Sequence, residues 1–252
     1  MTFLLITLAI LIVLVLYHHV GYLLLLKIFS NDKVNIESNA TLATTRFGIL
    51  MCAYNEQEHI REKLYNLGSM LYSTEQYAIH IYLDGCTDKT YDEAMIAQSH
   101  LAKQNVVCHL HFNKINKGKS FGVNELIKLT KPNYDVLLFT DVSALLSVDV
   151  LNKIDTDFKD PQVNVITGVY ILDDLATKEQ QQYWQYQNKV KSMESSLGAV
   201  IGVPGAMFAI RAEYAQLLDA STINDDFILS MKAQIQRHHH FHFFQILCKK
   251  LL

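Results

Sequence analysis

Short apolar runs alternate with segments of helical spacing between residues 47 and 172, and this alternation leaves few folds open to the chain. The apolar runs have the length of strands and cover residues 47–53, 77–83, 106–112, 134–140 and 163–172. The segments between them carry apolar side chains at the spacing of amphipathic helices, over residues 56–70, 88–101, 119–129 and 149–158. Strands that alternate with helices form a largely parallel sheet covered on both faces. We therefore predict an α/β, Rossmann-like fold.

The N-terminal 26 residues contain no Asp, Glu, Lys or Arg and are almost entirely aliphatic. As one helix they would span about 39 Å, which exceeds a hydrocarbon core of about 30 Å. A cleaved signal peptide is the alternative, although the early positive charge and small-residue cleavage site typical of one are not evident. Because Lys27 and Lys33 follow the run, we expect a transmembrane anchor over residues 1–27 and a linker over 28–45. The protein would then be single-pass in the inner or plasma membrane, with its catalytic domain in the cytoplasm.

Composition excludes two further classes of function. The formal net charge of −3 and the pI near 6.4 argue against a nucleic-acid partner, which usually requires a basic excess. The four cysteines are scattered without a CxxC pair, so neither a disulfide framework nor a structural zinc site is expected. This pattern agrees with a reducing compartment.

Polar residues follow the predicted strands at the points where each strand ends. The segments are Tyr54-Asn55-Glu56, Asp84-Gly85-Cys86-Thr87-Asp88, Asn116-Lys117-Gly118-Lys119 and Asp141-Val142-Ser143. Each segment alone is typical of an ordinary turn or helix cap. Ligands of such sheets bind beyond the carboxyl ends of the strands, however, and all these segments share that edge. The sequence therefore predicts a ligand site there.

Two later segments, Gly202–Arg211 and Asn224-Asp225-Asp226-Phe227, complete a recognisable order of motifs. Over residues 46–236 the chain resembles family 2 glycosyltransferases with a GT-A fold, of the membrane-bound type related to cellulose and poly-N-acetylglucosamine synthases. The resemblance implies a sheet of the GT-A kind and an enzyme that inverts the anomeric centre. It further implies a nucleotide-sugar donor, usually a UDP-sugar, a glycan or lipid-linked acceptor, and a divalent metal, Mg²⁺ or Mn²⁺.

The resemblance also implies a donor site, made of Ala53, Tyr54, Glu56, Asp84, Lys119 and Asp141. Asp141 stands where the family has the first acid of its metal motif, and Ser143 replaces the second acid with an uncharged oxygen. Asp84 would accept hydrogen bonds from the uridine, and Lys119 would meet the diphosphate or the base. The alternatives are a helix cap for Asp141 and a solvated side chain for Lys119.

The predicted catalytic residues lie in the triplet Asn224-Asp225-Asp226. The resemblance implies that Asp226 is the base that deprotonates the acceptor hydroxyl, and that Asp225 helps to position the base or the acceptor. The alternative is that Asn224 and Asp225 only cap the helix that begins at Phe227. Gly205 and Ala206 are expected on the acceptor side, because small residues let the backbone approach a sugar closely. A helix expected over 180–197 contains three aromatic residues, which suit sugar rings, packing or contact with a membrane surface.

The last residues depart from the family pattern. Processive relatives continue with a Gln-x-x-Arg-Trp motif and further membrane spans, whereas this chain has a histidine-rich segment from Arg237 onward. We expect an aberrant or truncated tail over 237–252, with a histidine metal site as the alternative. The competing functions are an inactive remnant or a non-catalytic nucleotide-sugar-binding membrane protein. A nucleotidyltransferase would need a glycine-rich, basic loop after the first strand, and Tyr54-Asn55-Glu56 is neither.

Overall fold

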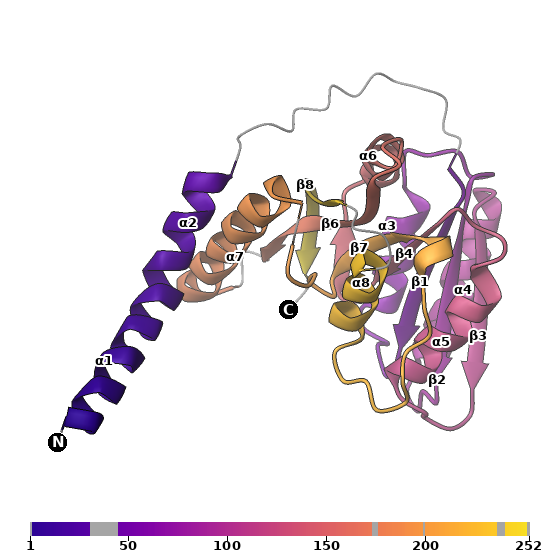
Figure 1. Ribbon diagram of the computed structural model, residues 1–252. Helices are drawn as coiled ribbons and strands as arrows, with labels where there is room; N and C mark the ends of the chain where they lie inside the picture. Colours follow the sequence, from indigo (N-terminus) through magenta and orange to yellow (C-terminus); the bar gives the residue numbers. More distant parts are fainter. Residues whose placement is uncertain (1, 31–44, 173–175, 199, 236–239, 251–252) are drawn as a thin grey trace.

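The structure is a computed structural model that describes residues 2–30, 45–172, 176–198, 200–235 and 240–250. Its centre is an eight-stranded sheet with the order β3-β2-β1-β4-β7-β6-β8-β5. Helices lie on both faces of this sheet, and a separate helical rod forms the N-terminus (Figure 1).

One half of the sheet is parallel and matches the predicted strands. It consists of β1 (Phe47–Ala53), β2 (Tyr77–Asp84), β3 (Val107–Asn113) and β4 (Val136–Thr140). β1 pairs in parallel with β2 and β4, and β2 pairs in parallel with β3. The carboxyl ends of all four strands therefore meet at one edge.

The other half is mixed. β7 (Met207–Arg211) runs antiparallel to both β4 and β6 (Val163–Leu172). β8 (His240–Lys250) runs parallel to β6 and antiparallel to the short β5 (Ala144–Leu146). The prediction of a mostly parallel α/β sheet is confirmed, with β7 as the antiparallel strand that joins the halves.

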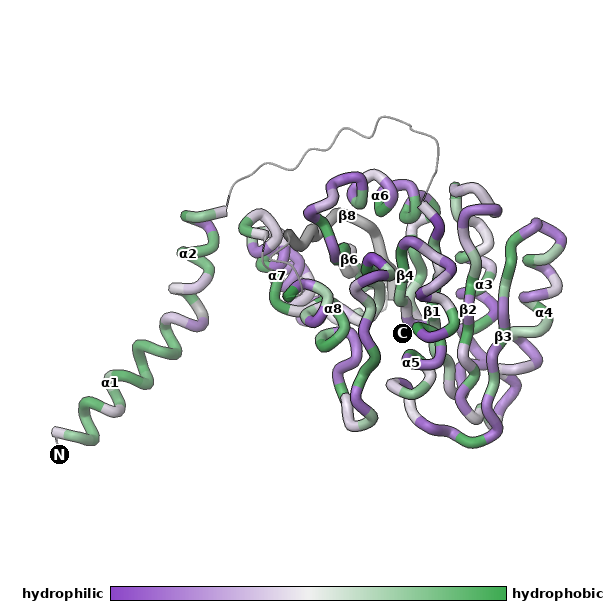
Figure 2. The backbone as a smooth tube through the Cα atoms, turned by 45° about the vertical axis from the view of Figure 1, so that its right-hand side comes forward, coloured by the Kyte–Doolittle hydropathy of each residue, from purple (hydrophilic) through white to green (hydrophobic). Residues whose placement is uncertain are grey.

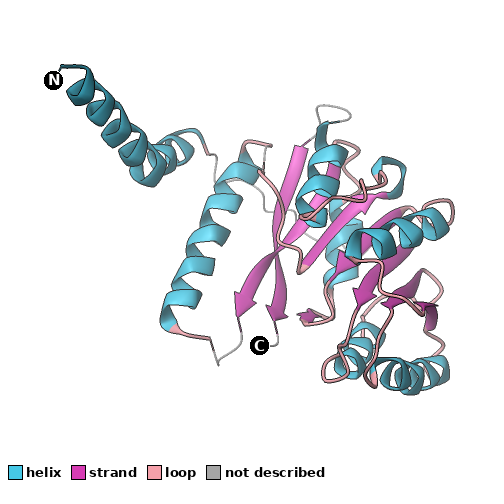
Figure 3. Ribbon diagram, turned by 90° about the horizontal axis from the view of Figure 1, so that it is seen from below, coloured by secondary structure: helices cyan, strands magenta, loops and turns pink. Residues whose placement is uncertain are grey.

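The helices divide between the two faces of the sheet (Figure 3). They are α3 (Ile60–Gly68), α4 (Thr90–Lys103), α5 (Lys119–Thr130), α6 (Val150–Asp157), α7 (Lys178–Ser196) and α8 (Asp225–Ile235). Side chains of α3, α4 and α6 pack with alternate β1 residues such as Ile49 and Met51. Those of α5 and α8 pack on the opposite face around Leu50. Because successive side chains of a strand point to opposite faces, one buried strand serves both cores.

The N-terminal apolar run is helical but divided. α1 (Thr2–Leu16) has 15 residues, a π-helical turn η1 follows at Tyr17–Gly21, and α2 (Tyr22–Phe29) has eight residues. The run is coloured as largely hydrophobic in Figure 2. Across the described ranges, no helix combines the length and apolar character needed to cross a membrane. A helix as long as α1 spans about 22 Å, short of a core of about 30 Å.

This finding contradicts the expected anchor over residues 1–27, and with it the single-pass membrane localisation and cytoplasmic orientation. The prediction assumed one uninterrupted α-helix, and the π turn breaks that assumption. Residues 31–44 of the expected linker lie outside the described residues, as do residues 236–239 and 251–252. The backbone of the expected aberrant tail forms β8 over His240–Lys250, and its aberrant origin stays a prediction.

Candidate active site

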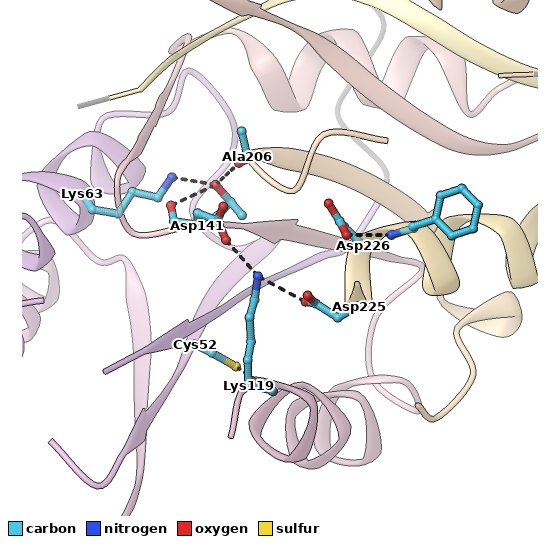
Figure 4. Close-up of polar contacts among 9 residues, drawn as sticks. Cys52, Lys63, Lys119, Asp141, Ala206, Asp225 and Asp226 are labelled. Carbon is cyan, nitrogen blue, oxygen red and sulfur yellow. Dashed lines mark hydrogen bonds and ion pairs between the residues drawn. The ribbon is translucent and has the colours of Figure 1, made fainter. Parts of the chain in front are cut away.

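Three charged side chains meet at the carboxyl edge of the parallel strands. Lys119 is the first residue of α5, Asp141 follows β4, and Asp225 begins α8. Lys119 Nζ lies 3.1 Å from Asp141 Oδ1 and 3.2 Å from Asp225 Oδ2 (Figure 4). Burial lowers the pKa of Lys119, but the two carboxylates outweigh it and raise the pKa above its ordinary value. Lys119 is therefore a fixed positive charge between two acids.

Asp226 lies beside this network in the first turn of α8. Its Oδ1 accepts a hydrogen bond from Phe227 N at 2.8 Å. Burial raises the pKa of the Asp226 carboxyl and the charge of Asp225 adds to the rise, although Phe227 N and Lys119 oppose it. An acid with a raised pKa exchanges protons closer to neutral pH, which is what a general base requires.

Gly205 separates Asp226 from Asp141. A Cβ atom added to Gly205 would lie 2.9 Å from Asp226 Oδ2 and 3.6 Å from Asp141 Oδ2. The absence of a side chain at this position thus leaves both carboxylates open to the same space. A cavity of about 380 Å³ occupies that space, and Asp141, Asp226, Gly205 and Ala206 are among its lining residues.

Asp84 is buried at the end of β2, with an exposed fraction of 3%. Its carboxylate accepts hydrogen bonds from the backbone N–H groups of Lys117 and Gly118, at 3.0 and 2.7 Å. It therefore holds the loop that leads into α5, and its expected contact with uridine stays a prediction. Gly85 has a φ of +66°, and a Cβ there would lie 2.3 Å from Asn116 N, so only glycine fits this close approach.

The residues after β1 lie at the same edge. Ala53 is buried at the end of the strand, whereas Tyr54 is 51% exposed. Glu56 N donates to Thr90 Oγ1 at 2.7 Å, which ties this loop to the start of α4. The structure places Ala53, Tyr54 and Glu56 beside the loop after β2, and their contact with a nucleotide stays a prediction.

The donor set at Asp141 fits a metal that arrives with a phosphate ligand. Within the described ranges, no three His, Cys, Asp or Glu side chains gather in a way that could hold a metal. Asp141 keeps one oxygen on Lys119, and Ser143 is half-buried in the turn after β4. Mg²⁺ and Mn²⁺ sites of transferases often use one or two carboxylates together with substrate phosphates. The residues therefore fit such a metal and do not fit one held by protein alone.

Lys63 supports this site and was not anticipated. It is fully buried on α3, and its Nζ donates to Thr140 Oγ1 at 2.8 Å and to the Ala144 carbonyl. Thr140 Oγ1 in turn donates to the Ala206 carbonyl at 2.9 Å. The signal was present in the sequence, because Lys63 falls in the same helical stripe as Ile60, Leu64 and other inward residues.

Comparisons with known proteins agree with this geometry. The profile of the family described as Glycosyl transferase family 2 matches residues 48–218. The mannosyltransferase PcManGT from Pyrobaculum calidifontis, in complex with GDP-Man and Mn²⁺, superposes with a TM-score of 0.79 at 18% identity; the match covers 96% of this chain and 68% of that one. TarS 1–349 of S. aureus with UDP-GlcNAc gives 0.62 at 14% identity, over 82% of this chain and 59% of that one.

No curated protein matches the sequence. At these identities the structural matches establish the fold alone, whereas the family profile covers well over half of the chain. The predicted GT-A-like fold and glycosyltransferase assignment are confirmed: the chain belongs to glycosyl transferase family 2.

Proposed function

We propose that this glycosyltransferase moves a sugar from a nucleotide-sugar, most simply a UDP-sugar, to a glycan or lipid-linked acceptor with inversion at the anomeric carbon. The observation that carries the proposal is the arrangement of Asp141, Lys119, Asp225 and Asp226 around Gly205. In this proposal Lys119 and Asp141 face the donor diphosphate, and the carboxylate of Asp226 faces the acceptor hydroxyl. Polysaccharide or related glycan synthesis is the corresponding biological context.

The donor half of the proposal is supported by charge and by the structural neighbours. PcManGT was solved with GDP-Man and Mn²⁺, and TarS with UDP-GlcNAc. In this chain Asp141 and Ser143 would supply oxygen ligands, and Lys119 would face the diphosphate once Asp141 turns to the metal, while Asp225 stays paired with Lys119. A bound Mg²⁺ or Mn²⁺ would neutralise the charge that develops on the departing nucleoside diphosphate.

The catalytic half assigns the proton to Asp226. The acceptor oxygen attacks the anomeric carbon, the bond from that carbon to the diphosphate oxygen breaks, and the hydroxyl proton passes to the Asp226 carboxylate. Asp225 is held by Lys119 and therefore positions the start of α8 instead of accepting the proton. The raised pKa of Asp226 favours this division of roles.

Calorimetry with UDP, with and without Mn²⁺, tests the donor site. We expect binding that strengthens with Mn²⁺ and weakens in Asp141→Asn. Asp226→Asn should keep the affinity for UDP and lose transfer. An absence of UDP binding in both conditions contradicts the donor site, and UDP binding without transfer in the unmodified protein supports the alternative of a non-catalytic nucleotide-sugar-binding protein.

A further inference from the structure

The N-terminal helical rod contacts the rest of the protein through α2, which lies along α7 (Figure 1). Leu26 is 5% exposed, although most apolar side chains of the rod face solvent. Tyr22, the first residue of α2, donates a hydrogen bond from its hydroxyl to Glu194 Oε1. Burial raises the pKa of Tyr22 and Glu194 adds to the rise, so the hydroxyl keeps its proton and remains a donor at neutral pH.

Glu194 is a buried carboxylate that the proposed transfer does not use. It lies in the last turn of α7 and is 6% exposed. Its Oε1 accepts from Tyr22, and its Oε2 accepts from Ile201 N at 3.2 Å. A buried carboxylate is costly unless its oxygens accept hydrogen bonds, so each donor helps to keep Glu194 in place. Loss of the Tyr22 hydroxyl should therefore loosen the hold of Glu194 on Ile201.

Residues 201–202, which Glu194 holds, pack against the helix that carries the proposed base. Lys191 Nζ donates to the carbonyls of Ile201 and Gly202, at 3.2 and 2.9 Å, so α7 holds both the N–H and the C=O groups of these residues. Gly202 has a φ of +71°, and a Cβ there would lie 2.5 Å from the Phe227 ring. Phe227 N is also the group that donates to Asp226 Oδ1. A displacement of residues 201–202 would thus reach the start of α8.

The ammonium group of Lys191 provides a second connection between Glu194 and the proposed base. Burial lowers the pKa of Lys191, whereas the charges of Glu194 and Asp226 both act to raise it. Movement of Glu194 would therefore change the electrostatic surroundings of an amine that also interacts with Asp226.

We propose that Tyr22 is a positioning residue for the transfer: through Glu194 it holds residues 201–202, and these in turn hold the start of α8 and the carboxylate of Asp226. The N-terminal rod is then a working part of the enzyme. The assignment rests on the proposed function, because it takes Asp226 as the base, and it requires no contact between Tyr22 and either substrate.

Tyr22→Phe in the full chain tests this role, because it removes the hydroxyl and keeps the ring. With a UDP-sugar and an acceptor, we expect kcat for UDP release to fall about fivefold, since a small displacement of a catalytic group is enough for such a loss. The KM for the donor and the affinity for UDP should not change, because the contacts of Lys119 with Asp141 and Asp225 are untouched.

Tyr17→Phe is the matched control. Tyr17 lies on the π-helical turn just before α2 and is 50% exposed, so the substitution removes the same group from the same rod without touching Glu194. Its kcat should equal that of the unmodified protein. An unchanged kcat in Tyr22→Phe, or an equal fall in Tyr17→Phe, would overturn the proposal.

A double variant shows whether Tyr22 acts through Glu194. Glu194→Met keeps the length of the side chain and removes both accepting oxygens, and thermal denaturation checks that the variant folds. Adding Tyr22→Phe to Glu194→Met should then lower kcat no further, because the hydroxyl has already lost its partner. A double variant whose loss is the product of the two single losses would contradict the pathway through Glu194.

Amide hydrogen exchange tests the coupling without any activity. Exchange of the Ile201 amide, which donates to Glu194, should become about threefold faster in Tyr22→Phe and stay unchanged in Tyr17→Phe. An Ile201 amide that does not respond to Tyr22→Phe overturns the proposal even if kcat falls. If the unmodified protein transfers no sugar while Ile201 does respond, the coupling is supported and only the proposed function is contradicted.

Discussion

Replacing Gly205 by alanine should impair the proposed base without disturbing the fold. The new Cβ would lie 2.9 Å from Asp226 Oδ2, whereas ordinary contacts begin near 3.4 Å. The carboxylate must therefore move by about 0.5 Å. Its other oxygen is held by Phe227 N at 2.8 Å, so the movement turns the carboxylate about that bond and away from the cavity.

The size of the effect follows from this displacement. A misplacement of about 1 Å in a catalytic group can cost about 10²-fold, so half of it predicts a loss of about tenfold in kcat, equivalent to about 1.4 kcal/mol. The donor side should be spared, because the new Cβ lies 3.6 Å from Asp141 Oδ2, an ordinary contact. Gly205 does not have a positive φ, so its backbone accepts alanine.

The assay is the rate of UDP release with a UDP-sugar and an acceptor, with thermal denaturation as the control for folding. We expect kcat to fall about tenfold, the KM for the donor to stay unchanged, and Tm to hold or rise slightly. Asp226→Asn provides the benchmark for full loss. Full kcat in Gly205→Ala, beside an inactive Asp226→Asn, would refute the placement of the base. A raised donor KM at unchanged kcat would assign Gly205 to the donor instead.

Three further predictions concern stability and charge. Asp157 is 4% exposed and burial raises its pKa to about 7, so its protonation on folding should stabilise the protein as the pH falls. The free energy of unfolding of the wild type, relative to that of Asp157→Asn, should rise by about 1 kcal/mol between pH 8 and pH 6. A difference in urea midpoint between the two proteins that is the same at both pH values would contradict this prediction. Gly202 has a φ of +71° and a Cβ there would lie 2.5 Å from the Phe227 ring, so Gly202→Ala should lower stability by about 2 kcal/mol, and an unchanged Tm would contradict the clash. Lys119→Met should change the free energy of unfolding by less than about 1 kcal/mol, because the side chain is 48% exposed. The same substitution should weaken UDP binding about tenfold in calorimetry, because it removes a cation from the diphosphate. An unaltered affinity for UDP would show that Lys119 is not part of the donor site.

Much of the sheet could be predicted because its buried strands are short apolar runs bounded by turn residues. The predicted runs 47–53 and 163–172 coincide with β1 and β6. β5 has three residues, too few to give a periodic signal, and β8 arises from the histidine-rich tail. Such pairings depend on contacts between distant segments, which local patterns do not encode.

The site, like the sheet, could be predicted from local sequence patterns only in part. The shared edge of the parallel strands anticipated that Lys119 and Asp141 would lie close together. It did not reveal that Lys119 Nζ also reaches Asp225, which is brought in by α8 from the far end of the domain. The prediction of a transmembrane anchor in the N-terminal run was wrong for a different reason. Hydropathy measures apolar character, and it does not indicate the π-helical turn at Tyr17–Gly21.

The buried amine of Lys63 determines whether the entropy cost of ordering the segment around Asp141 falls on folding or on ligand binding. By holding Thr140 and the Ala144 carbonyl, it fixes the segment on either side of Asp141 before any substrate arrives. The entropy lost in ordering that segment is then spent during folding and does not reduce the affinity for the donor. Amide hydrogens of residues 141–146 should consequently exchange slowly in the free protein and change little on addition of UDP.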